Sequence, residues 1–161
     1  QKKGERHAVR SSLHPSGKAY AASVRIQKEF KFVLGGAYGT CFADRKSVLD
    51  YAERTFGTLP DYPWLKDPKS AVLRHQDTAK WYGLIMEIPP KRLGLSGQGA
   101  VDILNIKCDP LVLGGLIDYQ RYFPAYHMNK EKWVSAILNG TIPQEELFSL
   151  LRQSFALTKG K

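Results

Sequence analysis

"YHMNKEKWVSAILNG", residues 126–140, is the stretch that decides the fold. Its first half places a histidine, an asparagine and two lysines between Tyr126 and Trp133, one residue after a Phe-Pro pair that is typical of a turn. Its second half, residues 133–140, is a mostly apolar run that ends in Asn-Gly, which predicts a strand followed by a turn. The stretch therefore predicts a polar loop that leads into a buried strand.

Residues 141–158, "TIPQEELFSLLRQSFALT", form the clearest helical pattern in the chain. Thr141 and Gln144 have the spacing of a capping box, which predicts that this helix begins at Thr141. The expected buried stripe recurs at helical spacing and consists of Leu147, Leu150, Leu151 and Phe155. An earlier helix is predicted from an N-cap at Asp44 to Gly57, with Val48, Leu49, Ala52 and Phe56 on its buried side.

Strand patterns fill the middle of the chain. Residues 71–76 and 80–88 predict a hairpin, and residues 101–108 alternate in a way that predicts a strand with one covered face. Asp109-Pro110 is typical of a helix start, and that helix should end near Asp118. Residues 58–70 hold three prolines and predict neither helix nor central strand. This order predicts an α+β fold: a mainly antiparallel sheet with helices packed on one face.

The N-terminal part is the most basic segment. The net charge of the chain is +9, of which residues 1–45 carry nine Lys and Arg against three acids. Residues 1–16 predict a basic tail or loop, and residues 17–34 predict an amphipathic helix with a basic outer face. We therefore divide the chain into the tail, a helical extension over 17–45 and a domain over 46–158. An uneven positive charge favours an anionic partner, although a solvated tail has the same composition.

Familiar catalytic patterns are absent from the sequence. It contains no GxSxG, P-loop, HExxH or GxGxxG motif, and its four histidines share no metal-ligand spacing. We therefore expect no enzyme, no metal and no cofactor. Cys41 and Cys108 lie far apart and outside any CxxC pair, which favours two small buried side chains in a reducing cytoplasm. No run of 18 apolar residues exists, so we expect no membrane partner.

Several motifs together resemble those of the MmcQ/YjbR-like family of small bacterial proteins. They are "NIKCDP" (105–110), "YFPAYHMNKEKWVSAILNG" (122–140), the final helix with its Ser154-Phe155 pair, and "YPWLKDPKSAVLRHQDTAKWYGLI" (62–85). The resemblance covers roughly residues 46–158, and residues 16–42 are similar to the end of an N-terminal extension that longer members carry. Gly35-Gly36 departs from the helix expected there.

The resemblance implies a fold like that of bacterial frataxin homologues or secretion chaperones, and a double-wing module that binds DNA. Candidate contacts are exposed cations, aromatics next to cations, and the polar loop beside the end of a strand. They are Arg74, Lys80, Trp81, Lys91, Arg92, Lys107, His127, Asn129, Lys130 and Lys132. For His127 and Asn129 a structural role in the loop is an equally good interpretation.

Two other functions compete with nucleic-acid binding. A protein-interaction or chaperone-like adaptor, acting as a homodimer or on another protein, would use an open sheet face or edge. Iron handling is suggested by the fold alone, and the absence of an acidic run argues against it because iron prefers hard carboxylate ligands. The favoured hypothesis is a non-enzymatic module that contacts phosphates without reading sequence.

Overall fold

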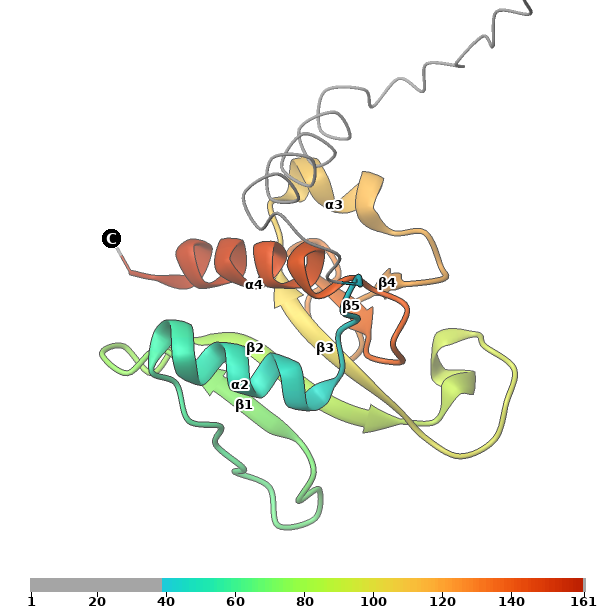
Figure 1. Cartoon of the computed structure of the whole chain (residues 1–161), viewed down its shortest axis with the longest axis horizontal. Helices are drawn as coiled ribbons and strands as arrows, with labels where there is room; N and C mark the ends of the chain where they lie inside the picture. Colours follow the sequence, from blue (N-terminus) through green and yellow to red (C-terminus); the bar gives the residue numbers. More distant parts are fainter. Residues whose placement is uncertain (1–38, 161) are drawn as a thin grey trace, which may run out of the picture. The chain divides into compact units, whose positions relative to one another are not determined.

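A computed structural model describes residues 39–160 as a five-stranded antiparallel sheet with helices (Figure 1). The strand order β1-β2-β3-β5-β4 confirms the predicted α+β class. The predicted tail over 1–16 and helix over 17–34 lie outside the described residues. The elements are α2 (Arg45–Phe56), β1 (Ala71–Arg74), β2 (Trp81–Ile88), the 3₁₀ turn η1 (Pro90–Leu93), β3 (Val101–Lys107), α3 (Pro110–Leu116), β4 (Tyr122–Pro124), β5 (Trp133–Ile137) and α4 (Gln144–Thr158).

Helix α2 begins and ends as its sequence predicts. The Asp44 carboxylate accepts the backbone N–H of Ser47 at 2.8 Å, and the Ser47 hydroxyl accepts the N–H of Asp44 at 2.9 Å. This reciprocal pair satisfies two donors that have no partner inside a helix. At the other end Gly57 adopts φ 65°, a left-handed conformation that glycine takes at little cost.

Helix α4 begins three residues later than predicted, so the capping box at Thr141 was wrong. Ile142 accepts the backbone N–H of Ala43 at 2.8 Å, and an antiparallel bridge joins Phe42 to Pro143. This pairing holds residues 142–143 extended, with Pro143 at ψ 138°. The Thr141 hydroxyl instead bonds the Asn139 side chain at 2.6 Å. Pairing with a segment a hundred residues away therefore overrides the local capping pattern.

The two long helices run in the same direction and pack on each other through aromatic pairs. Tyr51 stacks on Phe148 with ring centroids 4.1 Å apart, and Phe56 stacks on Phe155 at 4.2 Å. Helix α4 in turn packs on β2 and β3. Its buried residues are Leu147, Leu151, Ser154 and Thr158, so two polar side chains extend the predicted stripe.

Two strand predictions need correction. The central residues of β3, from Ile103 to Ile106, are all buried, so this strand is covered on both faces rather than one. Polar Asn105 belongs to the buried set, and its side chain bonds the Ser135 hydroxyl and the backbone carbonyl of Tyr126. The predicted Phe-Pro turn is edge strand β4, which pairs with β5. Pro124 is tolerated there because an edge strand leaves one row of N–H positions unpaired.

Candidate functional site

A pocket of about 580 Å³ lies at one end of the sheet. The first residues of β2 and β5 and the last residue of β3 meet there because neighbouring strands are antiparallel. The C-terminal end of α4 forms another part of its wall. Its lining consists of Lys80, Trp81, Lys107, Met128, Trp133, Leu157, Thr158, Lys159 and Gly160. We call this the basic aromatic pocket.

A bulge in β2 orients the tryptophan of the pocket. Leu73 pairs with Gly83 and Arg74 pairs with Trp81, which leaves Tyr82 as an extra residue. Tyr82 is buried among the helix aromatics, with its ring centroid 5.0 Å from that of Phe155. The extra residue places Trp81 on the sheet face opposite to the one that regular alternation would give it.

The hydroxyl of Ser154 hydrogen-bonds the backbone groups that this bulge leaves unpaired between β2 and β3. It accepts the backbone N–H of Lys107 at 2.8 Å and donates to the carbonyl of Tyr82 at 2.6 Å. Both backbone groups lie where the pairing of β2 with β3 ends. A buried residue of α4 therefore satisfies a carbonyl and an N–H that have no partner strand. Ser154 therefore fixes the end of α4 against the two strands that carry Trp81 and Lys107.

Trp81 is held from outside the pocket by the proline-rich segment before β1. The Trp64 ring packs edge-on against Trp81 with centroids 5.7 Å apart. The Arg74 guanidinium lies 5.3 Å from the Trp81 ring centroid and forms an ion pair with Asp61 at 2.9 Å. Arg74, one of the predicted nucleic-acid contacts, thus has a carboxylate and an indole as partners already.

Three lysines give the pocket its charge. Among residues 39–160, none of Lys80, Lys107 and Lys159 forms an ion pair, and no acidic residue lines the pocket. Lys80 Nζ lies close to Gly160, just past the C-terminus of α4, where the helix dipole favours a positive charge. The pocket therefore presents three ammonium groups without internal neutralisation.

His75 lies buried close to the pocket and adds no charge to it. Its Nε2 lies 2.7 Å from the hydroxyl of Thr158, and its ring packs on Phe155 at 4.2 Å. Burial lowers the pKa of His75; Asp77 opposes the change, while Lys159 and Lys80 reinforce it. The imidazole is therefore neutral at pH 7, and its role is to pack under the end of α4.

The opening stretch forms a turn between β4 and β5 that is built around Asn129. The side-chain oxygen of Asn129 accepts the backbone N–H of Glu131 at 2.8 Å. The backbone carbonyl of Asn129 accepts the N–H groups of Lys132 and Trp133. His127 is exposed at φ 56°, and its ring lies edge-on to Tyr126 at 4.1 Å. These contacts support a structural role for Asn129, whereas the His127 side chain makes no hydrogen bond within the described residues.

The structure brings only part of the predicted contact set together. Lys80, Trp81 and Lys107 line the pocket, while Arg74 contacts Trp81 from outside it. The turn that carries His127, Asn129, Lys130 and Lys132 contributes Met128 to the lining, and those four residues do not line it themselves. Lys91 and Arg92 are exposed in η1, beyond the opposite end of β2. Six lining residues were not among the predicted contacts: Met128, Trp133, Leu157, Thr158, Lys159 and Gly160.

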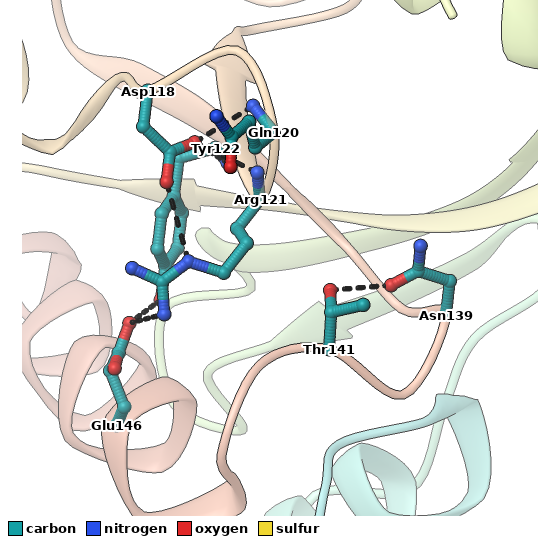
Figure 2. Close-up of polar contacts among 7 residues, drawn as sticks. All are labelled: Asp118, Gln120, Arg121, Tyr122, Asn139, Thr141 and Glu146. Carbon is teal, nitrogen blue, oxygen red and sulfur yellow. Dashed lines mark hydrogen bonds and ion pairs between the residues drawn. The ribbon is translucent and has the colours of Figure 1, made fainter. Parts of the chain in front are cut away.

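A second polar cluster ties edge strand β4 to the start of α4 (Figure 2). Arg121 pairs with Asp118 at 3.3 Å and with Glu146 at 3.6 Å, and the Tyr122 hydroxyl donates to Glu146 at 2.7 Å. Burial and the Glu146 carboxylate raise the pKa of Tyr122 well above its usual value. The members of this cluster satisfy one another, so it serves the fold rather than a ligand.

The Asp118 carboxylate anchors that cluster by capping its turn. Its Oδ1 accepts the backbone N–H groups of Gln120, Arg121 and Tyr122 at 2.8–2.9 Å. Burial works against ionisation here, but the three N–H donors outweigh it and lower the pKa of Asp118 to about 2.

Neither metal ligation nor membrane insertion is evident in residues 39–160. No three His, Cys, Asp or Glu side chains in this part of the chain gather closely enough to hold a metal ion. No helix in it combines the length and the apolar character needed to cross a bilayer.

Comparison with known proteins identifies the family. The family model described as YjbR matches residues 54–157. The chain belongs to the YjbR family. This confirms the family resemblance expected from the sequence motifs.

Proteins that are similar to this chain in sequence or in structure come from three bacteria. The Bacillus subtilis (strain 168) "Uncharacterized protein YyaQ" is 47% identical over 115 residues, which are 71% of this chain and 98% of that protein. A Pseudomonas syringae crystal structure is 43% identical, with a TM-score of 0.70, and covers 72% of this chain and 99% of its own. The crystal structure of Deinococcus radiodurans protein DR2400 is 25% identical, with a TM-score of 0.57, and the match covers 74% of this chain and 81% of that one.

Proposed function

We propose that this YjbR protein binds nucleic acid without reading its sequence, by contacting phosphates at the basic aromatic pocket. The observation that carries the proposal is the convergence of Lys80, Lys107 and Lys159 in one cavity whose lining, within residues 39–160, holds no acid. Lysine ammonium groups act on phosphates as point charges and carry no base specificity. The net charge of +9 would add long-range attraction to a polyanion.

The module has no catalytic step in this proposal. The pocket lining consists of three lysines, four large apolar side chains, Gly160 and one threonine, Thr158. The Thr158 hydroxyl already donates to the Ser154 carbonyl at 2.8 Å and contacts His75. A nucleophile or general base needs a free lone pair directed at the substrate, and the Thr158 hydroxyl is occupied.

The charge of the pocket can be tested against an equal charge elsewhere. Lys107→Gln/Lys159→Gln removes two positive charges from the pocket, and Lys91→Gln/Arg92→Gln removes two from η1. The length of β2 separates the two places by roughly 26 Å. Binding of a labelled 20-mer DNA, single-stranded and duplex, is followed by fluorescence anisotropy at three salt concentrations.

We expect wild-type affinity in the non-specific range of about 10⁻⁴–10⁻⁶ M at physiological salt. The pocket variant should flatten the slope of log K against log salt by about 1.8 on the duplex, from about 0.9 for each lost phosphate contact. The η1 variant should change it by less than half of that. Equal changes in the two variants would remove the pocket from the contact surface. No binding to either DNA at low salt would refute the proposal.

A protein-interaction adaptor is the second candidate, favoured by apolar exposure on and after α3. Leu111 is 93% exposed, Val112 42% and Tyr119 65%. Such a surface is expected at a contact with a second copy or with another protein. Multi-angle light scattering over a range of concentrations tests the homodimer: dimers that Leu111→Glu abolishes would support it, and a monomer throughout would argue against it.

A further inference from the structure

We propose that the basic aromatic pocket accepts an unpaired nucleobase between Trp81 and Trp133, with its phosphate held by the surrounding lysines. This inference rests on the proposed nucleic-acid binding and adds a preference for single strands over duplex. Its ligand chemistry is a base attached to a phosphate, which a single strand or a free nucleotide can supply.

The spacing of the two tryptophans suits a planar ring. Trp81 begins β2 and Trp133 begins β5, with β3 between them in the sheet. Two inter-strand spacings put their backbones roughly 9.6 Å apart. A ring sandwiched between two aromatic faces needs two contacts of about 3.5–4.0 Å each, or about 7–8 Å. Both indoles are only half-buried and line the cavity, so part of each ring remains accessible from it.

The rest of the lining divides into apolar and charged parts. Met128 and Leu157 add apolar surface, and Leu157 is 45% exposed. Lys80 and Lys159 are exposed, and Lys107 is half-buried on the strand between the two tryptophans. An inorganic phosphate would leave the apolar surface wet, whereas a base with its phosphate matches both parts.

The volume of the pocket is also appropriate. About 580 Å³ falls within the range of about 300–1,000 Å³ that is usual for small-ligand sites. A base in a duplex reaches such a pocket only after unstacking and unpairing, which disfavours the duplex. A base in a single strand does not have to break a pair. The pocket should therefore bind single strands more tightly than duplex. It should accept any base, because every base has a face that can stack.

Tryptophan fluorescence reports on this site directly. The chain has three tryptophans: two line the pocket, and the third, Trp64, packs against Trp81. The probes are a 12-mer oligothymidylate, a 12-mer with the same phosphates and only abasic sites, a 12-base-pair duplex, and thymidine monophosphate. The abasic strand keeps the phosphate charges and removes the bases.

A matched pair of variants localises the effect. Leu157→Glu places a carboxylate in the pocket at an exposed helix position, and Gln153→Glu makes the same charge change one turn earlier, at an exposed residue outside the lining. Both substitutions are at solvent-exposed positions, so circular dichroism should show both variants folded. Trp64→Phe removes the indole fluorescence outside the lining, keeps an aromatic ring against Trp81, and leaves Trp81 and Trp133 as reporters.

The oligothymidylate should quench the fluorescence and bind at least about tenfold more tightly than the abasic strand, as one or two stacked bases provide. Leu157→Glu should remove this difference, and Gln153→Glu should keep it. Equal binding of the abasic and normal strands would overturn the inference and leave phosphate binding intact. Failure of all strands to bind would refute the proposed function itself. If thymidine monophosphate binds as tightly as the 12-mer, the pocket recognises a base but its ligand is a free nucleotide. That result would contradict the proposed binding of nucleic acid.

Discussion

Replacing Ser154 by alanine is the most informative perturbation of the fold around the pocket. The Ser154 hydroxyl is fully buried and joins α4 to the backbone of both Tyr82 and Lys107. Ser154→Ala removes this link and leaves one carbonyl and one N–H without a partner where the β2–β3 ladder stops. An alanine side chain leaves almost no room for water to replace the hydroxyl.

The expected loss follows from these two groups. Leaving a buried polar group without a hydrogen bond costs about 1–3 kcal/mol. Two groups near the lower end of that range give about 2–3 kcal/mol of lost unfolding free energy. For a domain of this size, about 3–4 °C of Tm is lost for each kcal/mol. We therefore expect Tm to fall by roughly 6–12 °C.

Ser149 provides the matched control for this experiment. It lies on the same helix, is half-buried, and its hydroxyl makes no hydrogen bond within residues 39–160. Thermal unfolding followed by circular dichroism compares Ser154→Ala with Ser149→Ala and the wild type. If the two variants unfold within about 2 °C of each other, Ser154 does not fasten α4 to the strands as we infer.

Three further substitutions test the polar turns. The low pKa of Asp118 means that its ionised form stabilises the fold above about pH 4, and this contribution is lost as the pH falls towards 2. Because the side chain is 34% exposed, we expect only about 1 kcal/mol from it. Asp118→Asn should therefore lower Tm at pH 7 and match the wild type near pH 2, and a difference that is the same at both pH values would contradict this account. Asn129→Ala should lower Tm by about 3 °C because it removes the turn bond to Glu131, whereas His127→Ala should change the unfolding free energy by less than about 0.5 kcal/mol. Differential scanning calorimetry measures both, and a larger loss for His127→Ala would reverse our assignment of their roles.

Local patterns in the sequence were sufficient for most of the elements. The cap at Asp44, the glycine at 57 and the proline-rich segment over 58–70 act on their own neighbours in the chain, so their effects could be predicted without a fold. The hairpin formed by β1 and β2 and the strand before Asp109 followed from periodicity in the same way. The order of these elements predicted the α+β class, which the structure confirms, and the family motifs predicted the family, which the comparison confirms.

Several features depended on segments that are far apart in the sequence. Helix α4 starts later than predicted because Phe42 and Ala43 pair with residues 142–143. The segment at Phe123 is a strand instead of the predicted turn because it pairs with β5. Ser154 is buried because a bulge elsewhere leaves a carbonyl and an N–H for it. Such effects leave no periodic trace in the sequence, since they depend on which distant segments meet.

The sequence by itself therefore determined most of the helices and strands, the family of the chain, and that cations and aromatics are abundant. Only the tertiary structure decided which of those side chains share a site. It joined Lys80 and Lys107 with Lys159, which follows the last helix, and it separated Lys91 and Arg92 from them by the length of a strand. The physical reason is that propensity and capping act over a few residues, whereas strand register and the bulge at Tyr82 set the direction of each side chain through pairing across the sheet.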